Sequence, residues 1–100
     1  MSSESGSFHV AYSTALKQEI KDILSKAKQV GELEGYARAL LEIDDRMRTD
    51  PFGLGELKGR LAKLKLDVHV ACVRPLVVEF AIDAQRKLVF VKRVESLVNL

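Results

Sequence analysis

Hydrophobic residues recur at helical spacing over two stretches in the N-terminal half of the chain. Within each stretch the apolar positions are three or four residues apart and charged residues lie between them, which is typical of an amphipathic helix. The first stretch follows Ser13 and Thr14, either of which can cap a helix, and ends at Gly31. The second ends before Pro51, because the residue preceding a proline disfavours helix. The apolar positions are Leu16, Ile20, Ile23, Leu24, Ala27 and Val30, then Leu33, Tyr36, Ala37, Leu40, Leu41, Ile43 and Met47.

The pattern changes to a period of two on either side of these helices, and this alternation predicts strands. Residues 8–12 alternate before the first helix, and a short piece over 57–64 leads into strands over 66–72, 76–82 and 88–94. Pro75 cannot donate to a strand ladder, so Arg74-Pro75 is predicted to be a turn, a bulge or a strand edge. The order predicts an α+β fold, β-α-α-β-β-β(-β), in which an antiparallel helical hairpin covers one face of an antiparallel sheet.

Length and composition indicate one globular domain. The chain has 100 residues, of which 47% are hydrophobic and 30% charged, too apolar for a disordered chain and too short for two cores. We expect a disordered leader at residues 1–7, a single domain over 8–97 and a tail at 98–100. No apolar run approaches the roughly 20 residues that span a bilayer. The lone Cys72 lies in an alternating strand, where we expect it to be buried, so we predict a reducing, cytoplasmic location and no membrane partner.

Charge is divided unevenly along the chain. The formal net charge is +2, made up of −3 over residues 1–56 and +5 over residues 57–100. A basic C-terminal half favours a polyanion or an acidic protein segment as the partner. Lys58, Arg60, Lys63 and Lys65 are four bases within eight residues. They either follow a phosphate backbone or protect an edge strand from pairing, and the sequence leaves both interpretations open.

A sheet covered by helices on one side leaves its other side free, and we expect the functional site there. The hypothesis is that this free face gathers a basic groove from several strands. Its expected members are Lys58, Arg60, Lys65, Asp67, His69, Arg74 and Arg93.

These residues and the element order resemble the RelE/ParE superfamily of toxins from type II toxin–antitoxin systems, the plasmid stabilisation type. The resemblance covers about residues 8–97 and includes Leu57-Lys58-Gly59, Lys63-Leu64-Lys65 and the junction residue Arg74. In the RelE branch it implies a metal-independent endoribonuclease, an mRNA interferase that cuts messenger RNA at the ribosome through the 2′-hydroxyl of the RNA. In the ParE branch it implies inhibition of gyrase.

The resemblance assigns candidate roles to individual residues. The catalytic candidates are Arg74 and Lys65, which would stabilise charge at the scissile phosphate, and His69 as the proton carrier. The RNA-binding candidates are Lys58, Arg60, Lys63 and Arg93. The C-terminal tail lacks the Tyr or His common in the family's ribonucleases. This departure leaves open a non-catalytic gyrase inhibitor or a degenerate RelE-fold module that binds protein.

The remaining expectations concern cofactors and partners. His9, His69 and Cys72 do not have the spacing of a zinc site, and no phosphate-binding loop motif occurs, so we expect no cofactor and no metal. The expected partners are a cognate antitoxin protein and either mRNA with the ribosome or gyrase. Self-association as a homodimer is a further prediction.

Overall fold

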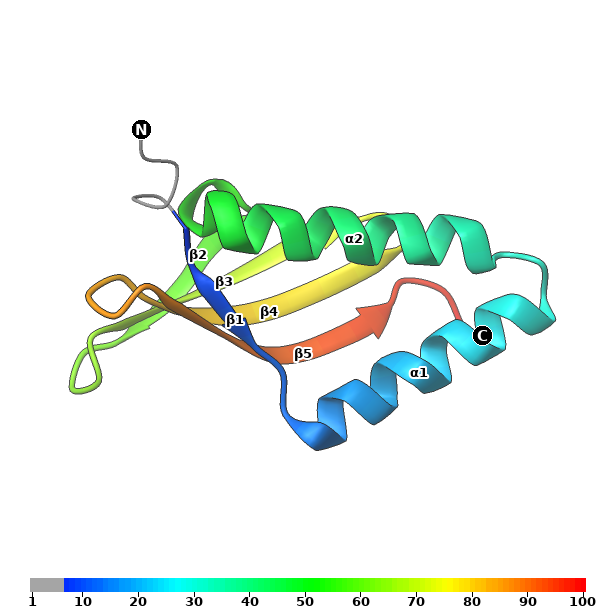
Figure 1. Cartoon of the computed structure of the whole chain (residues 1–100), viewed down its shortest axis with the longest axis horizontal. Coiled ribbons are helices and arrows are strands. Elements are labelled where there is room, and N and C mark those ends of the chain that lie inside the picture. The colour runs from blue at the N-terminus through cyan, green and yellow to red at the C-terminus, as the bar shows by residue number, and fades with distance from the viewer. Residues whose placement is uncertain (1–6) are drawn as a thin grey trace.

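The order of helices and strands confirms the predicted α+β class. The computed structural model describes residues 7–100, so the predicted leader lies, apart from Ser7, outside the described residues. Figure 1 shows one strand, two helices and then four strands. The elements are β1 (His9–Ala11), α1 (Thr14–Gln29), α2 (Leu33–Thr49), the short 3₁₀ turn η2 (Pro51–Gly53), β2 (Glu56–Leu61), β3 (Leu66–Val73), β4 (Leu76–Asp83) and β5 (Leu88–Ser96).

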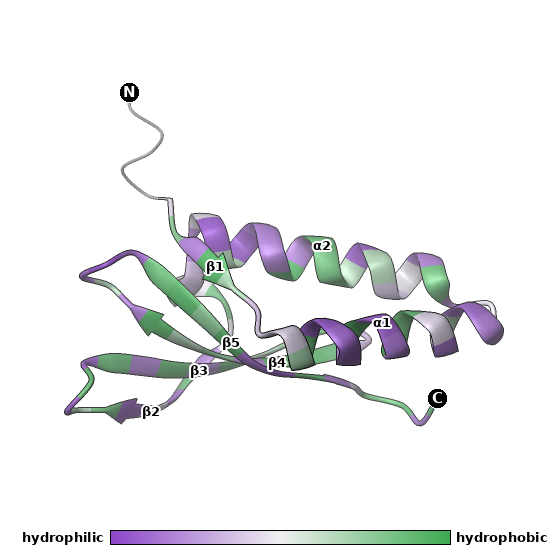
Figure 2. Ribbon diagram, turned by 60° about the horizontal axis from the view of Figure 1, so that its bottom comes forward, coloured by the Kyte–Doolittle hydropathy of each residue, from purple (hydrophilic) through white to green (hydrophobic). Residues whose placement is uncertain are grey.

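The strands form a single sheet in the order β1-β5-β4-β3-β2. β2 to β5 form the predicted antiparallel meander. β1 pairs in parallel with β5, with His9 opposite Leu88, so the sheet is mixed and not wholly antiparallel. Both helices lie on one side of this sheet, and Figure 2 shows the two layers. The other side is called the uncovered face below.

The ends of α1 are set by the residues that the sequence indicates. The Ser13 hydroxyl accepts a hydrogen bond from the backbone N–H of Leu16 at 3.0 Å and caps the helix. At the other end Gly31 takes a φ of 76°, which allows the N–H of Glu32 to reach the carbonyl of Ala27 at 2.7 Å. Neither helix of residues 7–100 is long and apolar enough to cross a membrane.

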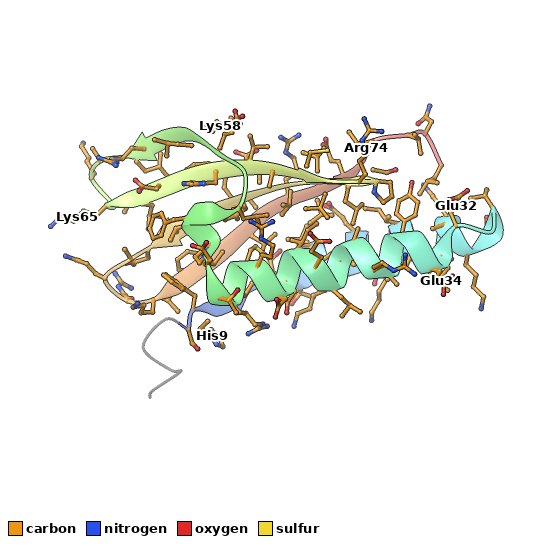
Figure 3. The ribbon with its side chains drawn as sticks, turned by 90° about the horizontal axis from the view of Figure 1, so that it is seen from above. His9, Glu32, Glu34, Lys58, Lys65 and Arg74 are labelled. Carbon is orange, nitrogen blue, oxygen red and sulfur yellow. The ribbon has the colours of Figure 1, made fainter. Side chains whose placement is uncertain are left out.

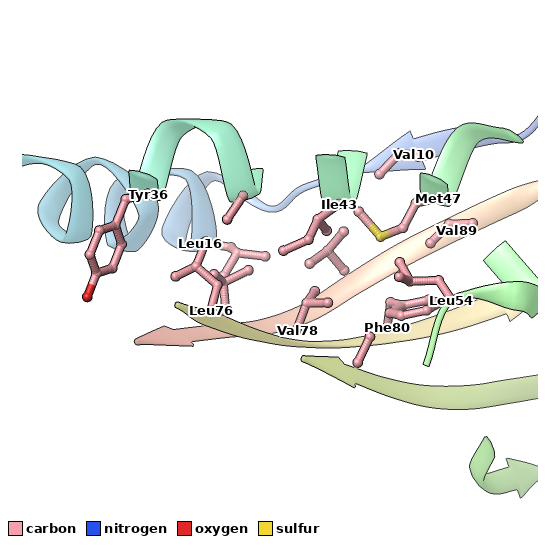
Figure 4. Close-up of a cluster of buried hydrophobic side chains, with 14 of the residues drawn as sticks. Val10, Leu16, Tyr36, Ile43, Met47, Leu54, Leu76, Val78, Phe80 and Val89 are labelled. Atoms are coloured by element: carbon pink, nitrogen blue, oxygen red, sulfur yellow. The ribbon is translucent and has the colours of Figure 1, made fainter. Parts of the chain in front are cut away.

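The core fills the space between the helices and the covered side of the sheet (Figure 4). Fully burying one large apolar side chain contributes about 1.5–3 kcal/mol, so this layer holds the helices on the sheet. Tyr36 reaches the far end of the core, where its hydroxyl hydrogen-bonds with Ser96 Oγ at 2.7 Å. The largest buried side chains are Tyr36, Phe80, Ile43, Met47, Leu54, Leu76, Ile82, Val78 and Val89.

The strand β3 faces the opposite way from the prediction. His69 pairs with Phe80 and Ala71 pairs with Val78, and these side chains belong to the covered side. Cys72 therefore lies on the uncovered face and is exposed, so the expectation of a buried thiol is wrong. Both registers of β3 carry apolar residues, so the alternation alone does not choose the buried face.

Candidate functional site: a charge cluster on the uncovered sheet face

Two strands each contain one extra residue, and both extra residues are lysines. In β2, Leu57 and Gly59 pair with two consecutive residues of β3, so Lys58 between them is the extra residue of a β-bulge. In β5, Val91 and Arg93 pair with two consecutive residues of β4, so Lys92 between them is the extra residue of a second bulge. A bulge turns an additional side chain toward one face without changing the face of the residues around it.

Both bulge lysines reach the same carboxylate, that of Glu79 in the central strand β4. Lys58 Nζ donates to Glu79 Oε2 at 3.0 Å, and Lys92 Nζ lies 3.7 Å from the same oxygen. Arg93, the cross-strand partner of Glu79, donates to Oε1 from two guanidinium nitrogens at 3.0 and 3.2 Å. We call these four residues, Glu79, Lys58, Lys92 and Arg93, the Glu79 cluster.

The Glu79 cluster has an excess of positive charge around a buried acid. Glu79 is 7% exposed, whereas the cations around it are about half exposed. The hydrogen bond from Lys58, followed by those from Arg93, outweighs burial and lowers the pKa of the Glu79 carboxyl below its ordinary value. Arg93 also pairs with Glu95 at 3.0 Å, and that contact, with Glu79, raises the pKa of the guanidinium. Three cations thus face two carboxylates, a net charge of +1.

The three residues predicted to be catalytic do not come together. Lys65 lies in the β2–β3 turn and Arg74 in the β3–β4 turn, and Figure 3 shows them at opposite ends of the sheet. His69 lies on the covered side. The predicted basic groove therefore does not form from this set, because its members occupy separate ends and separate faces.

His69 is packed as a core residue. It is 6% exposed, and its ring lies 6.0 Å from the ring of Phe52 and 5.7 Å from that of Phe80. Its Nδ1 is 3.4 Å from the carbonyl oxygen of Leu54, a contact that favours the tautomer with the proton on Nδ1. The expectation that His69 lies on the polar register is wrong, because η2 and Leu54 fold over this part of β3.

The predicted RNA-binding residues divide between two places. Lys58 and Arg93 are both members of the Glu79 cluster. Arg60 instead donates a hydrogen bond to Asp67 at 2.7 Å, and Asp67 lies on the same side of β3 as His69. Lys63 is in the β2–β3 turn. Sequence analysis missed Glu79 and Lys92. A charged residue inside the apolar run Leu76–Ile82 was the available signal for Glu79, since buried charges require partners.

The exposed cations of the Glu79 cluster are suited to binding anions. A depression of about 290 Å³ on this face is lined by Lys58, Val68, Glu79 and Lys92, among others. A phosphate or carboxylate entering it would compete with Glu79 for the lysines. Within residues 7–100 no three His, Cys, Asp or Glu side chains lie close enough together to bind a metal ion.

The chain is thus a small α+β protein with two helices on one side of a mixed sheet and the Glu79 cluster on the other side. In comparisons with known proteins, no family model, no curated protein and no solved structure matches the chain.

Proposed function

We propose that this chain is a toxin-like component of a type II toxin–antitoxin system that acts by binding its target without cutting RNA. The element order and the Leu-Lys-Gly element support the RelE/ParE resemblance. The observation that carries the non-catalytic form is the composition of the Glu79 cluster, which offers cations but no group suited to proton transfer. In this proposal the partners are a cognate antitoxin and gyrase.

Cleavage through a 2′-hydroxyl needs one group to accept a proton and another to donate one. Glu79 is a weak base, because its cationic neighbours lower its pKa. His69 is on the other side of the sheet. The Tyr12 hydroxyl forms a hydrogen bond with Asp44, and the Tyr36 hydroxyl forms one with Ser96. These positions disfavour a ribonuclease.

The remaining histidine, His9, is also far from the cluster. It pairs with Leu88, five positions along β5 from Arg93, which corresponds to about 16 Å of strand. The distance of His9 from the cluster supports the proposal that the uncovered face acts by binding through charge and shape.

The test compares gyrase inhibition with RNA cleavage by the same purified protein. We expect inhibition of DNA supercoiling, weakened by the double substitution Lys58→Ala and Arg93→Ala, and no discrete cuts in a message supplied with ribosomes. The control is Lys26→Ala with Lys28→Ala, which removes the same charge from exposed positions of α1. No effect on gyrase, or equal loss in both double variants, contradicts the proposal.

A ribonuclease is the second candidate, since cations such as those of the Glu79 cluster can stabilise charge on a scissile phosphate even though the cluster supplies no group for proton transfer. Discrete cuts in ribosome-bound message that disappear in Arg74→Ala would establish this function in place of the first. Self-association remains a prediction, which sedimentation of the purified chain tests directly.

A further inference from the structure

Two loops at one end of the sheet have the same length and the same first and last residues. The β2–β3 loop is Ala62-Lys63-Leu64-Lys65, and the β4–β5 loop is Ala84-Gln85-Arg86-Lys87. Because alternate hairpins of a meander turn at the same end, the loops project side by side, as Figures 1 and 2 show. They are called the paired loops below.

Each of the paired loops ends in a lysine with a positive φ. The angles are 56° at Lys65 and 59° at Lys87, and no other non-glycine residue in the described part of the chain has a positive φ. This left-handed conformation is unfavourable for residues other than glycine. Two lysines held at equivalent strained positions indicate that the side chain is needed there.

The paired loops and the strand ends beside them carry a local excess of positive charge. Residues 60–67 and 83–87 contain five bases against two acids, a net charge of +3, whereas the whole chain carries +2. Both acids form ion pairs within these segments, Asp67 with Arg60 and Asp83 with Arg86. Within residues 7–100, Lys63 and Lys65 make no ion pair, so their charges face solvent.

We propose that the paired loops bind the phosphate backbone of a nucleic-acid double helix. Two strand spacings separate the loops, about 10 Å, which is close to the width of the major groove of B-DNA, about 12 Å. Neither loop contains an aromatic side chain for stacking on bases, so a single strand is the less suitable ligand. This surface is distinct from the Glu79 cluster and does not depend on the function proposed for that cluster.

An anionic membrane is the alternative polyanion. It is less suitable because Leu64, 66% exposed, is the one large apolar side chain at the tips of the paired loops. A single inserted leucine contributes too little apolar burial to add much to the electrostatic attraction.

The experiment measures binding of the full chain to a labelled 20-base-pair DNA duplex of mixed sequence by fluorescence anisotropy between 50 and 200 mM salt. The expected result is sequence-independent binding that weakens as salt rises. The double substitution Lys63→Ala and Lys65→Ala removes two phosphate contacts. We expect it to weaken binding more than about tenfold at 0.1 M salt and to reduce the slope of log K against log salt by about two.

The matched control is Lys26→Ala with Lys28→Ala, which lowers the net charge equally at another part of the surface. Binding within about twofold of the unmodified chain supports the proposal, since the loss then follows position and not total charge. Equal loss in both double variants, no duplex binding at 50 mM salt, tighter binding to a single strand of the same length, or preference for vesicles containing phosphatidylserine would each overturn it.

Discussion

Lys58 and Glu79 are 21 positions apart in the sequence and form an ion pair of 3.0 Å across the intervening strand β3. The pairing makes the free energy of unfolding depend on pH. The folded-state pKa of Glu79 is below its ordinary value of about 4.3, so its contribution is present at neutral pH and is lost as pH falls below that value. Because the cations are half exposed, we expect a contribution of about 1 kcal/mol.

Urea unfolding between pH 3 and pH 7 measures this contribution. Glu79→Gln should be less stable than the unmodified chain at pH 7 and should approach it in stability at pH 3. A difference between the two chains that stays constant over this range would show that the pair is not linked to pH.

Tyr12 and Asp44 give a second pH effect at the alkaline end. The Tyr12 hydroxyl donates to Asp44 Oδ1 at 2.7 Å. Burial and this hydrogen bond raise the pKa of the Tyr12 phenol above its ordinary value of about 10. Its stabilising effect is therefore complete below pH 10 and is lost as pH rises further, which unfolding at pH 9 and pH 11 measures.

Tyr12→Phe is the corresponding variant. It should cost about 1 kcal/mol at pH 7, the usual value of one hydrogen bond, and should reduce the alkaline loss. Asp44 keeps its ion pair with Arg48 at 2.8 Å, so the variant should still fold. An unchanged alkaline loss in Tyr12→Phe would assign the effect to another group.

Gly55 is a position that only glycine fits, and Gly59 provides its control. Gly55 has a φ of 73°, and a Cβ there would overlap the carbonyl oxygen of Val70. We expect Gly55→Ala to cost about 2 kcal/mol or more, whereas Gly59→Ala, which meets nothing within 4 Å, should change stability by less than about 0.5 kcal/mol. Thermal and urea unfolding of both variants measure this difference in stability. Similar unfolding midpoints for the two variants would contradict the prediction.

Lys65 is predicted to lower the free energy of unfolding, because its backbone has a positive φ. Lys65→Gly relieves a φ of 56° and should raise the free energy of unfolding by about 0.5–1 kcal/mol. Lys63→Gly, in the same loop but without a positive φ, should be neutral or slightly destabilising. A loss of stability in Lys65→Gly would show that the lysine is kept for a structural contact.

Cys72 offers a direct probe of the uncovered face. Because the thiol is exposed, we expect the native chain to react with Ellman's reagent at one thiol per molecule without denaturant. A partner that covers this face should slow the reaction, whereas duplex DNA bound at the paired loops should not. Reaction only in denaturant would contradict the exposed position.

Much of the fold was predictable because its signals are local. Ser13 and Gly31 mark the ends of α1 through hydrogen bonds to residues within five positions. The orientation of β3 was not predictable, since it depends on Leu54 and Phe52 covering His69 across the fold. The charge cluster was half predicted, with Lys58 and Arg93 expected on the free face. Lys92 was missed because a bulge is decided by pairing between strands. Glu79 was missed because its cationic partners come from β2 and β5, which are distant in the sequence.

The two bulges give the charge cluster an unusual genetic property. Deleting Lys58 or Lys92 as a single codon would restore regular pairing in its strand, and the neighbours Leu57 and Gly59, or Val91 and Arg93, would keep their present faces. One cation could therefore be gained or lost by an in-frame insertion or deletion while the rest of the sheet stays unchanged.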